Sequence, residues 1–313
     1  MKQPSATFTL AGRTLNAAEA GLMSVRVTLL RGNHDSVELA LWPKTKFSAA
    51  KPGDELSLKL GFKDDERDVW SGKVTTVERT PSALLIVGHA PTAGLSRERK
   101  SSTYVGQTAG DIVRDLASSI QIDSVDGRAE FAYYAVDHRR SVWSHLLDLA
   151  TLTGSEISCS PSGGLRFLDV NPLPSTIRFR YGADLLAWRA GPAMEGAAPS
   201  FAAHGSASES GNDKWHWLNP DPTNGAGGSQ VVGAFHSHAL AEGLTTAVSD
   251  RAKRARVLGE VELVGQADLR AGDVLSLSGL DDDPGPLRAL AVRHTIDVAT
   301  GFRTLLQVEG TGT

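Results

Sequence analysis

"KPGDELSLKL" (residues 51–60) and "RAGDVLSLSG" (residues 270–279) carry one pattern in two distant parts of the chain. In each, a Gly-Asp pair precedes two leucines separated by a serine, which is typical of a tight turn at the entry to a half-buried β-strand. The shared residues are Gly53, Asp54, Leu56 and Leu58 in the first stretch and Gly272, Asp273, Leu275 and Leu277 in the second. Residues two apart on a strand share a face, so we expect these leucines to be core positions.

The segments that follow the two stretches also correspond. Each copy continues with an acidic loop and then a long hairpin, "GKVTTVERTPSALLIVGHA" (residues 72–90) in the first and "LAVRHTIDVATGFRTLLQVEG" (residues 290–310) in the second. The common order predicts two similar β-barrels separated by an inserted segment. Gly-Asp turns before strands are common in proteins, so chance repetition of the turn is the alternative interpretation.

The first copy lies in a region of short strands. Apolar or alternating runs cover residues 22–30, 36–42, 54–60, 69–80 and 83–90. Residues 31–35 have the composition of a hairpin turn. Strands at this regular spacing predict a small antiparallel barrel or sandwich over residues 1–93.

Residues 94–183 have a different character, which predicts an inserted α/β module. "QTAGDIVRDLASSI" (107–120) has apolar residues on one helical face and a capping arrangement of Thr108 with Asp111. "SVWSHLLDLATLTG" (141–154) reads as a second helix that begins at Ser141 and ends at Gly154. A hairpin, "SEISCS" followed by "LRFLDV", completes the module.

Strands resume after residue 183, and residues 184–313 are predicted to form the second barrel domain. It contains a long polar loop at 205–229 and a helix over 237–258. The predicted fold class is therefore mainly β with an α+β insertion, in which two related small β-barrels flank the α/β module.

Composition limits the class of protein. The chain has 313 residues, 41% of them hydrophobic and 22% charged, which is ordinary globular composition for about two domains. A net charge of −4 argues against specific nucleic-acid binding. The single cysteine, Cys159, cannot form an internal disulfide, and no apolar run approaches the roughly 18 residues of a membrane helix. We expect a soluble protein, made in the cytoplasm and without a membrane segment.

No motif predicts catalysis, a metal site or a cofactor. His236, His238, His216 and His204 are close in sequence, but no cysteine accompanies them and the chain has no His-Glu-x-x-His motif. No Gly-x-Ser-x-Gly nucleophile elbow occurs, and the glycine-rich residues 225–230 lack the lysine of a phosphate-binding loop. We therefore expect a protein that is not an enzyme and that holds no metal or cofactor.

Two features outside the repeat indicate contacts. Trp215 and Trp217 lie in a polar loop, which makes them candidate protein-contact residues, and packing onto their own domain is the alternative. Lys253, Arg254 and Arg256 are predicted to complement the end of the helix, and contact with an anionic partner is the alternative.

The sequence resembles the late control gene D family, the baseplate hub proteins of contractile phage tails and related injection systems. The same fold forms the N-terminal part of type VI secretion VgrG spike proteins. The resemblance is carried by "YVGQTAGDIVRDLA" (104–117), "SVWSHLLDLATLTGSEIS" (141–158) with "GGLRFLD" (163–169), and the closing segment from "LRAGDVLSLSGL" to Gly310. Residues 196–235 contribute little to it.

The resemblance implies a trimer with two related barrels in each chain, arranged as a pseudo-six-fold ring between an inner tube and a spike. The implied partners are two further copies, a spike protein, the inner tube and other baseplate proteins, in an assembled tail or injection particle. Because the sequence ends at Thr313, we expect the spike to be a separate polypeptide and no lysozyme domain to be present. A cell-wall hydrolase and a glycan-binding β-sandwich that uses the Trp215 loop are the rival interpretations.

Overall fold

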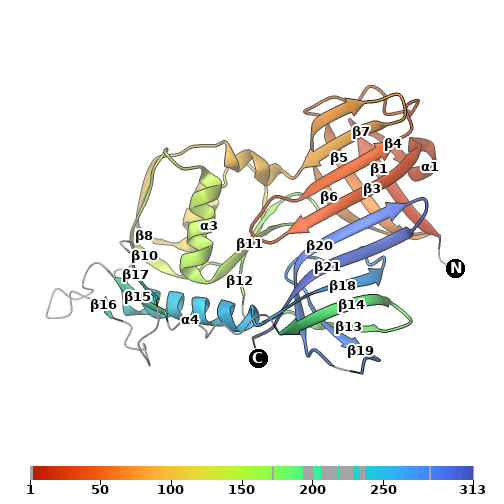
Figure 1. Ribbon diagram of the computed structural model, residues 1–313. Coiled ribbons are helices and arrows are strands. Elements are labelled where there is room, and N and C mark those ends of the chain that lie inside the picture. Colours follow the sequence, from red (N-terminus) through yellow and green to blue (C-terminus); the bar gives the residue numbers. More distant parts are fainter. Residues whose placement is uncertain are drawn as a thin grey trace.

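Strands from both ends of the chain form a single 13-stranded sheet in the computed structural model (Figure 1). The structure describes residues 3–170, 173–192, 201–205, 217–218, 228–232, 234, 237–281 and 283–312. The N-terminal strands, which we call unit 1, are β1 (Pro4–Leu10), β2 (Arg13–Asn16), β3 (Leu22–Leu30), β4 (Ser36–Leu41), β5 (Glu55–Phe62), β6 (Asp65–Arg79) and β7 (Leu84–His89), with the short helix α1 (Ala17–Ala20). The C-terminal strands, which we call unit 2, are β13 (Thr176–Arg180), β14 (Leu185–Pro192), β18 (Val257–Val264), β19 (Val274–Ser278), β20 (Leu287–Asp297) and β21 (Gly301–Gly310).

Alternating side chains give the sheet one buried and one open face. On β5, Leu56, Leu58 and Leu60 are at most 1% exposed, whereas Ser57 and Lys59 between them are not buried. Leu275 and Leu277 on β19 are buried in the same hydrophobic core, as the sequence pattern predicts. The core of unit 1 is thus continuous with that of unit 2.

The strand order joins the two units edge to edge. The sheet runs β14-β18-β21-β20-β3-β4-β7-β6-β5-β1-β2, with β19 paired to β20 and β13 paired to β19. Strand β20 therefore belongs to unit 2 but also pairs antiparallel with β3 of unit 1. The two strand sets predicted from the sequence are linked by main-chain hydrogen bonding rather than by side chains alone.

A separate module follows unit 1, on the left in Figure 1. Its elements are η1 (Pro91–Ser96), β8 (Ser102–Thr108), α2 (Ala109–Leu116), β9 (Ile122–Val125), β10 (Glu130–Val136), α3 (Val142–Thr153), β11 (Ser155–Cys159) and β12 (Leu165–Asp169). The predicted caps are confirmed: the side chains of Thr108 and Ser141 accept backbone N–H groups of their helices, and Gly154 ends α3 with a φ of 67°.

The connection between β14 and β18 carries further structure. It contains β15 (Phe201–Gly205), β16 (Trp217–Leu218), β17 (Gly228–Val232) and α4 (His238–Arg254). Leu240, Ala241 and Leu244 of α4 are buried in the hydrophobic core of the module, not in the core of the large sheet. The helix predicted over 237–258 is observed over His238–Arg254, with β18 beginning at Val257, and it packs beside α3 (Figure 1).

The sequence predicts domain boundaries after residues 93 and 183, and the observed strand pairings do not determine where these boundaries lie. Strand β13, at 176–180, pairs with β19 of unit 2, and α4 packs on the module. The boundaries 1–93, 94–183 and 184–313 stay a prediction. In the part of the chain that the structure describes, no helix is long and apolar enough to cross a membrane.

Candidate assembly interface

The two Gly-Asp turns have the same backbone geometry. Gly53 has a φ of 95° and Gly272 a φ of 100°, values in the left-handed region that glycine adopts without strain. The N–H of Gly53 donates to the carbonyl of Val74 at 2.8 Å, and the N–H of Gly272 donates to the carbonyl of Ala289 at 2.8 Å. A side chain at either glycine position is disfavoured for the same reason.

The aspartates of the two turns also act alike. Asp54 Oδ2 accepts the N–H of Lys51 at 3.0 Å, and Asp273 Oδ2 accepts the N–H of Arg270 at 2.8 Å. In both turns the aspartate carbonyl accepts a strand N–H at 2.9 Å. Gly-Asp is therefore required twice for the same local structure, which explains why the sequence repeats it.

The correspondence extends through five strands of each unit. Because each bonds its own Gly-Asp turn in the same way, Val74 on β6 is equivalent to Ala289 on β20. Following the ladders outward from these two strands makes β7, β4 and β3 of unit 1 equivalent to β21, β18 and β14 of unit 2. This register aligns the ion pair Arg26–Glu38 with the ion pair Arg189–Glu260, although neither was used to set it. A chance resemblance of two turns would not produce this agreement four strands away.

A matching irregularity supports the same register. The β6–β7 ladder shifts between Val74 and Thr76, and the β20–β21 ladder shifts between Ala289 and Ala291. Each shift is a β-bulge one residue after the strand position that bonds the Gly-Asp turn. The units differ at their outer strands, because β1 is antiparallel to β5 whereas β13 is parallel to β19.

The join between the units buries apolar side chains on one face. Residues 291–297 of β20 pair with residues 30–24 of β3. On the core side of this ladder, Val292 and His294 of β20 are 0% exposed, and Val25 and Val27 of β3 are also 0% exposed. The contact is therefore built as a continuous sheet with a shared core.

Each unit leaves one strand edge open among the described residues. Strand β14 is the end of the sheet, and among the described residues it pairs along its length only with β18. On β6 the β5 ladder stops at Lys73, so residues 76–79 pair only with β7 in the described part of the chain. The open edge of β14 corresponds to the edge of β3 that is paired with β20, and the open edge of β6 corresponds to the matching edge of β20.

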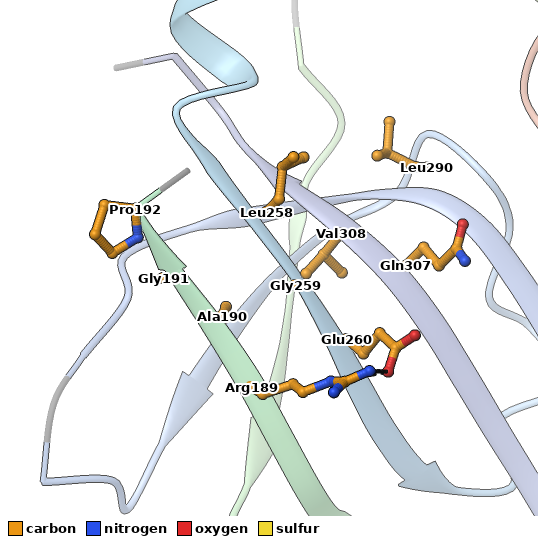
Figure 2. A pocket seen from close by; sticks show the side chains of 10 residues that line it. All are labelled: Arg189, Ala190, Gly191, Pro192, Leu258, Gly259, Glu260, Leu290, Gln307 and Val308. Atoms are coloured by element: carbon orange, nitrogen blue, oxygen red, sulfur yellow. Dashed lines mark hydrogen bonds and ion pairs between the residues drawn. The ribbon is translucent and has the colours of Figure 1, made fainter. Parts of the chain in front are cut away.

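A hollow of about 700 Å³ lies across β14, β18 and β21 (Figure 2). Its walls come mainly from apolar or small residues of β14, β18 and β21, with Leu290 from β20. Figure 2 shows the guanidinium of Arg189 and the carboxylate of Glu260 pointing toward each other across β14 and β18, with an Nε–Oε2 distance of 3.0 Å. The hollow offers apolar surface and one ion pair.

A network of charged side chains connects the three parts of the chain. Glu156 of β11 in the module accepts from Arg31 of unit 1 at 2.7 Å and from Arg288 of unit 2 at 2.6 Å. Glu309 of β21 accepts from Arg31 at 2.8 Å and lies 3.6 Å from Arg254 of α4. The exposed fractions of these five side chains run from 5% to 18%.

Burial makes this network structurally demanding. It holds three arginines and two glutamates, so each carboxylate must neutralise more than one guanidinium. Burial lowers the pKa of Arg254, an effect opposed by the nearby carboxylate of Glu309. Arg254 lies in the last turn of α4, where the sequence predicts a basic side chain, and it is buried because it joins this network.

Among the described residues, Cys159 and His34 are linked through Thr92, in an arrangement unsuited to nucleophilic catalysis. Thr92 Oγ1 lies between them, 3.2 Å from Cys159 Sγ and 3.1 Å from His34 Nδ1. Burial, with the adjacent charge of Asp35, raises the pKa of the Cys159 thiol to about 12, and burial lowers the pKa of His34. The thiol is therefore protonated at neutral pH, whereas nucleophilic attack needs the thiolate.

A buried histidine helps to fix the core at the junction. His294 Nε2 lies 3.3 Å from the carbonyl of Leu269, so this nitrogen donates, and Nδ1 accepts from the hydroxyl of Thr304 at 3.0 Å. The Thr304 hydroxyl in turn accepts the N–H of Gln266 at 2.9 Å. Burial lowers the pKa of His294 to about 3, so the neutral form is required in the folded state.

We expect this histidine to destabilise the protein in acid. Between the ordinary pKa of 6.5 and the folded value of about 3, the unfolded chain binds a proton that the folded chain does not. The contribution of His294 to the free energy of unfolding is therefore complete above pH 6.5. It falls by about 1.4 kcal/mol for each pH unit below that value. Urea unfolding of wild type and His294→Gln between pH 7 and 4 measures the difference, which should shrink by this slope as the pH falls.

Asp35 provides a control of opposite sign. Burial raises the pKa of Asp35 from 3.8 to about 7. The contribution of Asp35 to the free energy of unfolding is therefore complete below pH 3.8 and is lost as the pH rises toward 7. The Asp35→Asn variant should lose stability more steeply than wild type on acidification. Parallel curves for wild type and His294→Gln would contradict the assignment of a neutral buried histidine.

The candidate contact tryptophans fall largely outside the described structure. Trp215 lies outside the described residues; Trp217 is placed in β16, where its backbone pairs with Gly205 of β15. His216 and His236 also lie outside the described residues. Within the part of the chain that the structure describes, no group of three or more His, Cys, Asp or Glu side chains is arranged to hold a metal ion.

Sequence reasoning found the duplicated turns but missed the edges and the charge network. Glu156, Glu309, Arg31 and Arg288 come from four separate segments, and nothing in their local sequence signals burial. A signal for the edge was present in Pro192, because proline within a sheet is confined mainly to edge strands and strand ends.

Comparison with known proteins supports the fold. A scan of protein-family models and a search of curated proteins each find no match to the sequence. Among solved structures, a tail protein from Neisseria meningitidis MC58 matches with a TM-score of 0.73 at 13% identity, covering 99% of this chain and 97% of that one. The 43 kDa tail protein of prophage MuSo2 from Shewanella oneidensis matches with a TM-score of 0.69 at 13% identity, covering 98% of both chains.

A third match comes from a secretion system. An Escherichia coli component of the type VI secretion system, described as structurally similar to the T4 bacteriophage tail proteins gp27 and gp5, matches with a TM-score of 0.62 at 8% identity. The match covers 92% of this chain and 73% of that one. The chain thus has the mainly β fold of phage tail hub proteins, and the resemblance in fold that the sequence predicts is confirmed.

Proposed function

We propose that this chain is a structural baseplate hub protein of a contractile phage tail or of a phage-like contractile injection system. Three copies form a ring that joins the inner tube to a separate central spike. The observation that carries the proposal is the duplicated unit, in which five strands repeat in one register within a chain that has a tail-hub fold.

A duplicated unit is suited to a protein that joins a six-fold assembly to a three-fold one. Three chains with two equivalent units each present six similar units, which match a six-fold tube on one side. The same three chains repeat only three times as whole molecules, which matches a three-fold spike on the other side. A closed ring of this kind needs one heterologous interface repeated around the axis.

The open face of the sheet is the proposed lining of the lumen. Its side chains include the ion pairs Arg26–Glu38 and Arg189–Glu260, whereas the opposite face is packed into the core. The α/β module predicted at 94–183 would lie at the periphery. The segment that contains Trp215 and Trp217 would contact the spike, the inner tube or another baseplate protein.

The role is structural, without catalytic turnover. The tail-protein neighbours and the buried, protonated Cys159 both favour this proposal over a hydrolase. The protein would be made in the cytoplasm and would then become part of the tail or injection particle, with no specific binding to nucleic acid.

We expect the purified protein to be a trimer. Light scattering should give three times the 33.1 kDa of one chain, because three chains with two units each supply the six units of the proposed ring. Cryo-electron microscopy of the assembled particle should then place the ring between tube and spike. A monomer that binds glycans would favour the lectin-like alternative. Muramidase or amidase activity that one carboxylate substitution abolishes would favour the hydrolase.

A further inference from the structure

We propose that the open edge of β14 pairs with the open edge of β6 in a second copy of this chain. The pairing is antiparallel and has the register that β3 and β20 have inside one chain. This inference rests on the ring assembly proposed above and names the surface that closes it. Its occupant is a second copy of the chain, because the complementary edge is present on the same molecule.

Apart from their outer strands, the two units are equivalent strand for strand. Strand β14 corresponds to β3, and β6 corresponds to β20, through ladders that agree across five strands. One of the two possible unit-to-unit contacts, β20 with β3, is made within the chain. The other joins β14, at one end of the sheet, to the unpaired residues 76–79 of β6, and within this chain it is not made, so another copy must supply it. Its head-to-tail direction lets the same contact repeat around a ring.

The internal contact fixes the register between copies. Arg293 of β20 is the partner of Thr28 of β3. By the unit equivalence, Arg293 corresponds to Glu78 and Thr28 corresponds to Gly191, so Glu78 should face Gly191 of the neighbouring copy. The flanking pairs are then Val77 with Pro192 and Arg79 with Ala190.

Burial differs between the paired and the open edges as this model requires. Val292 on β20 is completely buried at the internal contact, whereas its equivalent Val77 on β6 is only half-buried. Val27 on β3 is completely buried, whereas its equivalent Ala190 on β14 is half-buried. Val77 and Ala190 are apolar, so a second copy would extend the core at these positions as well as the sheet. The equivalent of His294 on this side of β6 is the charged Arg79, whose guanidinium donates to the carbonyls of Ser48 and Ala50 at 3.0 Å.

The backbone groups at the open edge of β14 are also available. The N–H of Arg31 reaches the carbonyl of Leu290, so alternate residues of β3 direct their polar groups toward β20. The equivalent alternation on β14 directs Ala190 and Pro192 toward the open edge. Pro192 has no N–H to donate, so this position would contribute only its carbonyl.

A disulfide between copies tests the register directly. The double variant Glu78→Cys with Gly191→Cys places one thiol on each open edge. Both positions are on the open face of the sheet, and a Cβ at Gly191 meets no atom within 4 Å. Directly opposed strand residues have Cα atoms within the range that a disulfide spans. Cys159 is buried and its thiol is protonated, so it does not compete.

After mild oxidation we expect loss of the single-chain band on non-reducing denaturing gels and its replacement by a species of three chains. Reduction should restore the single chain. The positive control is Thr28→Cys with Arg293→Cys, which should form the equivalent bond within one chain. The matched negative control is Glu78→Cys with Ala187→Cys, whose second thiol lies on the same strand but four residues away, about 13 Å, and should not cross-link.

The outcomes separate this pairing from the proposed function. A solution trimer that forms no cross-link overturns the edge pairing and leaves the ring proposal standing. A ladder of ever longer covalent chains supports the pairing and overturns the closed ring. A monomer without cross-links, measured up to high protein concentration, overturns both.

Discussion

Replacement of Glu156 by glutamine is expected to lower the free energy of unfolding by about 3–5 kcal/mol, because it leaves buried arginines without a balancing charge. Glu156 bonds to Arg31 of unit 1 at 2.7 Å and to Arg288 of unit 2 at 2.6 and 2.5 Å. Glutamine keeps the size of the side chain, so the loss measures charge rather than packing. Urea unfolding at neutral pH and fixed protein concentration gives the value.

The matched control is Glu38→Gln. Glu38 also pairs with an arginine, at 3.0 Å from Arg26, but the two side chains are 56% and 51% exposed. Exposed ion pairs contribute about 0–1 kcal/mol, so this variant should remain close to wild type. Equal effects of the two substitutions would mean that the buried network does not hold the three parts of the chain together.

Leu275→Ala and Leu56→Ala should each cost about 2–5 kcal/mol, since both side chains are at most 1% exposed and their removal leaves a cavity. The two positions follow equivalent turns and face a continuous core, so the two losses should be similar. Thermal or urea unfolding of the two single variants measures them.

The control for this pair is Val298→Ala, at the β20–β21 turn, where the side chain is 85% exposed. Its unfolding free energy should stay within about 0.5 kcal/mol of wild type. A loss at Leu275 with none at Leu56 would show that unit 1 does not depend on its leucine strand as unit 2 does, and would argue against equivalent cores.

Local signals in the sequence were sufficient for the parts of the fold that depend on local physics. Alternation placed Leu56 and Leu275 in the core, and short polar side chains at Thr108 and Ser141 predicted the starts of α2 and α3. The Gly-Asp pairs indicated a duplication, because a left-handed glycine and an aspartate that accepts a backbone N–H are both needed for that turn.

The pairing of β20 with β3 was beyond such signals. A ladder forms through backbone groups that every strand carries, so a strand's own sequence does not identify its neighbour. For the same reason, the sequence did not predict that β13 is parallel to β19 whereas β1 is antiparallel to β5. Glu156 was missed for a different reason: its burial depends on Arg31 and Arg288, which lie far from it in the sequence.

The unequal connections of the two units have a consequence for how such a gene can change. Unit 1 joins β3 to β4 through the five residues 31–35, whereas unit 2 joins the equivalent β14 to β18 through residues 193–256, which include α4. Because both units are encoded on one chain, one copy of the connection could lengthen while the other stayed short. A gene with one unit, used six times, would have to repeat any such growth at all six places. Duplication therefore allows the connection in one unit of each chain, three of the six units in the proposed ring, to acquire new binding surfaces. The strands that hold the sheet together need not change.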